Sequence, residues 1–105
     1  MDLIYKVQLS NTAEDDLSEI VEKILNISYS KESAEKWVNI ILDKAYSLDR
    51  FPIRNSKTAK AGNKTIWHIN VKGKYIIYYE IDDKNQTINI RRIISNKRDE
   101  RSVSL

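Results

Sequence analysis

The spacing of the apolar residues changes twice along this chain, and these changes restrict the possible folds more than any other feature. Residues 3–9 alternate between apolar and polar side chains, which predicts a strand with one buried face. Across residues 13–50 apolar side chains recur every three or four positions, which predicts two amphipathic helices. Across residues 65–95 the alternation returns in three stretches, which predicts three more strands. The expected element order is therefore β-α-α-β-β-β.

Capping residues place the ends of the two predicted helices. Side-chain oxygens at residues 10–12 can cap the first helix, which we expect to end near Ile27, and Ser30 can cap the second. Pro52 disfavours a helical conformation at the residue before it, so the second helix is expected to end near residue 50. Because the link between the helices is short, we expect an antiparallel helical hairpin.

Turn residues divide the second half of the chain. The polar and basic residues 53–64 are predicted to form a loop. Short polar turns at residues 72–73 and 82–85 join the last three strands, which predicts an antiparallel meander. The charged residues 96–105 are expected to form a loose tail. Two helices that bury their apolar stripes on one sheet face give an α+β fold, a two-layer sandwich with a mostly antiparallel sheet, in a single domain over residues 1–105.

The same periodicity places individual side chains. Asp16 belongs to a set of acids on the first helix that we expect mostly on its outer face. Alternation puts Tyr75 and Tyr79 on one face of the sheet and Tyr78 on the other, with at least one of the three in the core. His68 is expected on the sheet face away from the helices, or near an edge.

Composition excludes several kinds of chemistry. The 105 residues contain no cysteine, which excludes disulfides, thiolate metal sites and cysteine nucleophiles. A single histidine argues against a zinc site and two glycines provide no nucleotide-binding loop, so we predict neither a metal nor a cofactor. The acids at positions 80, 82 and 83 are interpreted as turn residues rather than as a cation site. Without a signal-peptide pattern or a membrane-spanning apolar run, the protein is expected to be cytoplasmic and to have no membrane partner.

Charge is distributed unevenly along the chain. Residues 1–49 carry ten acids and five bases, whereas residues 50–105 carry five acids and thirteen bases. The first part therefore has a net charge of −5 and the second a net charge of +8. Residues 50–79 contain seven bases and no acid. This asymmetry predicts a polyanionic or acidic partner for the basic part.

Five short sequence patterns follow one another in the order of the predicted elements. They are YKVQLS with AEDDLSEI at residues 5–10 and 13–20, AEKW at 34–37, LDRFPIR at 48–54, KYIIYYEID at 74–82, and IRRII with KRD at 90–94 and 97–99. Together they resemble the RelE/ParE superfamily of toxins from type II toxin–antitoxin systems, and more closely its ParE-like branch. The resemblance implies a toxin that arrests growth, is associated with plasmid stabilisation, and forms a hetero-oligomer with a cognate, acidic-tailed antitoxin.

The resemblance implies one of two targets. ParE-like members poison DNA gyrase, whereas RelE-like members are endoribonucleases that cut mRNA on the ribosome. RNA cleavage requires a group that takes the 2′ proton, cations that stabilise the phosphate, and an acid for the leaving oxygen. RelE-like toxins supply a strand arginine and a Tyr or His near the C-terminus, but here Ile76 occupies the strand position and neither residue type follows Ser95. We therefore expect a gyrase poison, with a metal-independent mRNA endoribonuclease or an inactive antitoxin-binding module as the alternatives.

Each alternative assigns different residues. If the protein is a nuclease, His68, Arg92 and Arg98 are the candidate catalytic residues. The cations expected to bind the target are Lys72, Lys74, Arg91, Lys97, Arg98 and Arg101. An antitoxin is expected to contact the exposed faces of the two helices, and its acidic tail to occupy the basic residues and so block the target. The sequence alone does not decide between gyrase and the ribosome.

Overall fold

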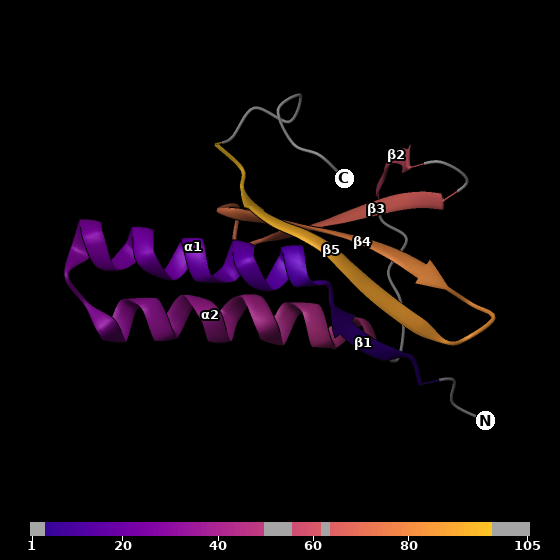
Figure 1. The fold of residues 1–105 in the computed structure, drawn as a ribbon, viewed down its shortest axis with the longest axis horizontal. Helices are drawn as coiled ribbons and strands as arrows, with labels where there is room; N and C mark the ends of the chain where they lie inside the picture. The colour runs from indigo at the N-terminus through magenta and orange to yellow at the C-terminus, as the bar shows by residue number, and fades with distance from the viewer. Residues whose placement is uncertain (1–3, 50–55, 62–63, 98–105) are drawn as a thin grey trace.

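A computed structural model describes residues 4–49, 56–61 and 64–97 (Figure 1). The chain forms two α-helices, one short 3-10 helix and five strands. These are β1 (Lys6–Leu9), α1 (Asn11–Ser28), α2 (Lys31–Tyr46), η1 (Ser47–Asp49), β2 (Ser56–Ala61), β3 (Lys64–Val71), β4 (Tyr75–Asp82) and β5 (Thr87–Ser95). None of the helices within the described residues is long and apolar enough to cross a membrane.

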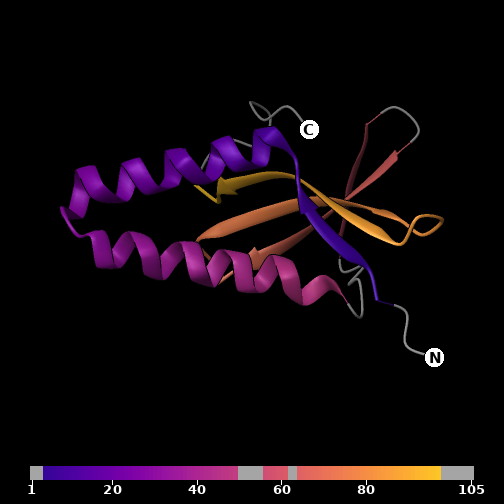
Figure 2. The same cartoon turned by 60° about the horizontal axis from the view of Figure 1, so that its bottom comes forward.

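The strands form one mixed sheet in the order β1-β5-β4-β3-β2. The last three strands make the predicted antiparallel meander, whereas β1 pairs with β5 in parallel. Both helices lie against one face of the sheet, and in both views the turn between them projects beyond the sheet (Figures 1 and 2). The predicted α+β class and two-layer arrangement are confirmed.

Serine caps begin both helices as predicted. The side chains of Ser10 and Ser30 each accept a backbone N–H from three residues further on, at 3.0 and 3.1 Å. The first helix ends one residue beyond the expected position, where Tyr29 adopts a left-handed conformation with φ of 54° and donates its N–H to the helix. The second helix ends at Tyr46, earlier than expected, and continues as the 3-10 turn that buries Leu48.

The sheet buries side chains on both faces. The main core lies between the sheet and the helices, where Ile41 of α2 packs with Ile77 and Tyr79 of β4. A smaller cluster lies on the opposite face and contains Ile66, Ile76, Tyr78 and Ile94. The predicted separation of Tyr78 from Tyr79 onto opposite faces is confirmed, and both rings are buried.

Two expectations about the loop and the first helix were wrong. The predicted loop over residues 53–64 contains strand β2, which pairs with β3 antiparallel at the edge of the sheet. Its sequence, SKTAKA, has no strong apolar alternation, and the register shift between residues 57 and 59 breaks the pattern further. Asp16 is buried rather than on the outer face of α1, because Arg92 from β5 meets it.

Candidate functional site

Arg92 is held by a buried carboxylate on the first helix. A β-bulge at residues 91–92 interrupts the pairing of β5 with β4. The guanidinium donates from Nε and Nη2 to the two carboxylate oxygens of Asp16, at 2.8 and 3.1 Å. The same carboxylate accepts the Ile93 N–H at 2.9 Å. The hydrogen bond with Asp16 raises the pKa of Arg92, so the guanidinium stays charged. The resulting ion pair joins α1 to β5.

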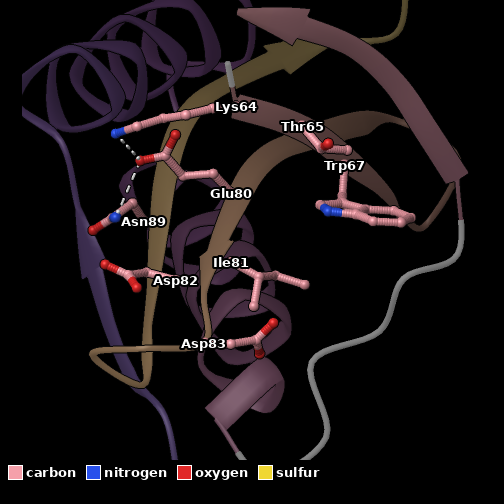
Figure 3. Close-up of a pocket in the computed structure, with 8 residues that line it drawn as sticks. All are labelled: Lys64, Thr65, Trp67, Glu80, Ile81, Asp82, Asp83 and Asn89. Carbon is pink, nitrogen blue, oxygen red and sulfur yellow. Dashed lines mark hydrogen bonds and ion pairs between the residues drawn. The ribbon is translucent and has the colours of Figure 1, made fainter.

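Glu80 organises a second polar cluster, on the sheet face away from the helices (Figure 3). Its side chain is 11% exposed and pairs with Lys64 Nζ at 3.4 Å and with Arg91 Nη1 at 3.1 Å. Asn89 donates its amide to the same carboxylate at 3.2 Å and accepts a hydrogen bond from Gln8 at 2.6 Å. The network therefore crosses four strands, from β1 to β3. Glu80 was expected in a turn, and this interpretation was wrong because the strand continues through it.

Two open pockets meet at this cluster. One, of about 520 Å³, is lined by Lys64, Thr65, Trp67, Glu80, Ile81, Asp82, Asp83 and Asn89 (Figure 3). The other, of about 590 Å³, extends over β1 and the start of α1. The charged lining is already engaged, because Asp82 accepts hydrogen bonds from Asn85 and Asp83 accepts one from Tyr5. The hydrogen bonds from the Asn85 side chain and backbone lower the pKa of Asp82. In the described part of the chain, no cluster of three side chains is suited to hold a metal ion.

Three exposed lysines gather at the opposite end of the strands. Lys72 and Lys74 flank Gly73 in the β3–β4 turn, where Lys72 and Gly73 both have positive φ angles, of 53° and 70°. Asn96 ties the end of β5 to this turn, because its backbone N–H donates to the Lys74 carbonyl at 3.0 Å and its side chain donates to the Gly73 carbonyl. Lys97 is the next residue. We call Lys72, Lys74 and Lys97 the lysine end.

An aromatic pair supports the lysine end from the helix side. The Lys74 ammonium lies 4.8 Å from the centre of the Trp37 ring of α2, a cation–π arrangement. The Trp37 ring in turn meets Tyr75 edge to face, with their centres 5.6 Å apart. Partial burial raises the pKa of the Tyr75 phenol. The aromatic contact orients Lys74 without neutralising its charge.

Two groups of cations on and beside the sheet differ in their partners. Lys64, Arg91 and Arg92 each pair with a carboxylate. No ion pair found within residues 4–49 and 64–97 involves Lys72, Lys74 or Lys97. The sequence predicts this division only in part. It shows that Glu80 is the single acid between residues 50 and 81, but only the fold shows that its partners lie beside it on neighbouring strands.

The predicted site residues do not form one cluster. His68 is half-buried on the sheet face away from the helices, with its ring centre 6.1 Å from that of Tyr78. Arg92, on the other neighbouring strand, also pairs with Tyr78, and its guanidinium extends to Asp16 of α1. Arg91 lies with Glu80, apart from the lysine end, and Arg98 and Arg101 lie outside the described residues.

A family match over most of the sequence places the chain among the toxins of type II toxin–antitoxin systems. The family model described as "ParE toxin of type II toxin-antitoxin system, parDE" matches residues 7–100. The chain therefore belongs to the ParE toxin family, and with it to the RelE/ParE superfamily. Among curated proteins, none matches the sequence.

Solved structures share this fold at low sequence identity. The chromosomal ParDE system of Pseudomonas aeruginosa superposes with a TM-score of 0.71 at 15% identity, covering 88% of this chain and 96% of that one. The toxin–antitoxin complex RelBE2 of Mycobacterium tuberculosis gives 0.58 at 23% identity, covering 89% and 99%. The archaeal RelE–RelB complex of Pyrococcus horikoshii gives 0.53 at 15% identity, covering 91% and 99%.

Proposed function

We propose that this toxin arrests growth by poisoning DNA gyrase and that it carries out no RNA cleavage. The observation that carries the proposal is the engagement of Arg92, the described cation among the nuclease candidates. Arg92 and His68 are both cross-strand neighbours of Tyr78, but the Arg92 guanidinium donates two hydrogen bonds to the buried carboxylate of Asp16. RNA cleavage requires a cation that stabilises the phosphate, and Asp16 already matches the charge of this one.

A gyrase poison needs a shaped and charged surface rather than an acid–base pair. The lysine end supplies such a surface, with three cations that retain their charge for a partner. The match to the ParE family over residues 7–100 also supports this target, because the ParE-like branch is the one that the resemblance associates with gyrase. Proteins that share a fold can differ in function. The gyrase target is therefore argued from this chain's own lysines and from the family that its sequence matches.

Pulse labelling tests the target directly. The toxin is expressed without an antitoxin, and the incorporation of labelled thymidine and of labelled amino acids is followed side by side. We expect thymidine incorporation to fall first, in the wild type and equally in His68→Ala. If amino-acid incorporation falls first and His68→Ala abolishes the effect, the toxin is an mRNA endoribonuclease. If neither rate changes, the chain is an inactive antitoxin-binding module.

We also propose a cognate antitoxin that binds the exposed faces of the helical hairpin. Ile27 and Tyr29, 75% and 90% exposed, lie at the projecting turn, where large apolar side chains without a covering partner are costly in water. The RelBE2 and archaeal RelE–RelB structures are complexes of this kind. An acidic antitoxin tail over the lysine end would then block the target. Co-purification with the neighbouring gene product should be lost in the Ile27→Asp, Tyr29→Asp variant, and retention would count against this interface.

A further inference from the structure

We propose that the lysine end binds the phosphate backbone of duplex DNA, without preference for sequence. This inference deepens the proposed function, on which its role in the cell rests, by naming the component of a gyrase–DNA complex that the toxin contacts. The binding itself is a property of the isolated chain and is tested separately below.

The available charge is the first argument. Lys64 and Arg91 share the buried carboxylate of Glu80 and Arg92 pairs with that of Asp16, so a polyanion would have to compete with Glu80 or Asp16 for them. The three residues of the lysine end are exposed and take part in no ion pair found among residues 4–49 and 64–97. The lysine end therefore offers the expected polyanion three cations that no ion pair found among residues 4–49 and 64–97 matches.

The rigidity of the lysine end is the second argument. Asn96 fixes the start of the tail to the β3–β4 turn through two hydrogen bonds, so Lys97 is held close to the turn that carries Lys72 and Lys74. The Trp37 ring orients the Lys74 ammonium. Side chains that are ordered beforehand lose less conformational entropy when they bind.

The position of the lysine end is the third argument. The β3–β4 turn and the end of β5 lie together at one end of the strands, and the β4–β5 turn with Asp82 and Asp83 lies at the other (Figure 1). The first end carries three cations, whereas Asp82 and Asp83 at the second end are offset by Lys84 and Lys6, so the excess positive charge that steers a polyanion lies at the first end.

The residue types point to phosphate rather than to bases. Lysine ammonium groups act as point charges that position a protein on nucleic acid but do not distinguish base pairs. Duplex DNA carries about one negative charge per 1.7 Å of its axis, so three neighbouring ammonium groups meet several phosphates in any register. The amide of Asn96, which could contact a base edge, is engaged with the Gly73 carbonyl.

Counterion release gives the expected salt dependence of the affinity for DNA. Each neutralised phosphate contributes about −0.9 to the slope of log K against log salt concentration, so three lysines contribute about −2.7. Between 50 and 200 mM salt this part of the affinity falls about 40-fold.

The experiment measures binding of a fluorescent 30-base-pair duplex by anisotropy between 50 and 200 mM KCl. The test variant is Lys72→Gln, Lys74→Gln, Lys97→Gln. The matched control is Lys23→Gln, Lys31→Gln, Lys84→Gln, which removes the same charge from three exposed lysines on α1, α2 and the β4–β5 turn. Thermal unfolding followed by circular dichroism checks that both variants keep the wild-type Tm.

We expect the test variant to lose about 2.7 from the salt slope and the control to keep the wild-type slope. An equal loss in both variants would mean that net charge alone attracts the duplex, and it would overturn the proposal. So would an undetectable interaction of the wild type at 50 mM. Displacement of the duplex by polyglutamate more effectively than by unlabelled duplex, at equal charge, would show that the surface prefers carboxylates and would also overturn it.

A gyrase cleavage assay separates this inference from the proposed function. If wild-type toxin traps cleaved plasmid and the test variant traps it equally well, the lysine end is not the DNA contact although gyrase is the target. If wild-type toxin traps no cleaved plasmid but still binds the duplex through the lysine end, the DNA-binding inference stands and the gyrase proposal fails.

Discussion

The contact of Asp16 with Arg92 makes a quantitative prediction about stability. The two side chains are 7% and 13% exposed, and the carboxylate accepts two hydrogen bonds from the guanidinium and one from the Ile93 N–H. Removing one partner of a buried ion pair typically costs about 3–5 kcal/mol, because the remaining charge stays buried. Since Arg92 keeps some access to water, we expect Asp16→Ala to lower the free energy of unfolding by about 3 kcal/mol.

Urea denaturation followed by tryptophan fluorescence measures this change. For a chain of this length, about 3 kcal/mol corresponds to a decrease in Tm of about 12–24 °C. The neighbouring Asp15, which is exposed, provides the control, and Asp15→Ala should change the stability by less than about 0.5 kcal/mol. Equal effects of the two substitutions would refute the argument that burial makes the Asp16 contact important.

A double variant tests the mechanism of the loss. In Asp16→Leu, Arg92→Met both charges are absent, so the cost of an unpaired buried guanidinium disappears. The Ile93 N–H still loses its acceptor, at a cost of about 1–3 kcal/mol. The double variant should therefore be more stable than either single variant but less stable than the wild type. A double variant as unstable as the sum of the two single variants would contradict this explanation.

Three further predictions concern single positions. Ser10→Ala removes the cap of α1 and should destabilise the fold by about 1 kcal/mol in urea denaturation, whereas Ser10→Gly should cost only a few tenths. Ile41→Ala, at a fully buried position, should cost about 2–5 kcal/mol, and a loss below about 1 kcal/mol would mean that the core collapses into the space. In an NMR titration the carboxyl of Asp82 should have its midpoint below 3.8, because Asn85 donates hydrogen bonds to it. Its contribution to stability is therefore present above that pH and is lost as the pH falls through the lowered pKa. Asn85→Ala should raise the midpoint, and an unchanged midpoint would exclude Asn85 as the cause.

The elements that were predicted correctly depend on local patterns. The caps at Ser10 and Ser30 act within one helical turn, and the tight turns of the meander involve only adjacent residues. Strand β2 was missed because an edge strand is stabilised through backbone hydrogen bonds to one neighbour, so its side chains need not alternate.

The features of the candidate site that were missed depend on contacts distant in sequence. The sequence predicts Asp16 on the outer face of the helix, because its partner Arg92 lies 76 positions further along the chain and is not visible in the local pattern. The bulge in β5 changes the alternation at this point, so that Arg92 pairs with Tyr78 and Ile93 enters the main core, and a regular alternation does not predict that arrangement. The sequence identified Lys72, Lys74 and Lys97 as target-binding candidates together with Arg91, but only the fold separates the lysines from the arginine that Glu80 holds.

The parallel pairing of β1 with β5 has a consequence during synthesis of the protein. Gln8 of β1 and Asn89 of β5 face each other across 81 positions of sequence. Translation proceeds at about 5–20 residues per second, so β1 is synthesised about 4–16 s before its partner strand. Asp16 is likewise synthesised about 4–15 s before Arg92. A nascent chain therefore cannot close its sheet, and a product terminated before β5 lacks both contacts. Only translation through β5 supplies both the parallel partner of β1 and the ion-pair partner of Asp16.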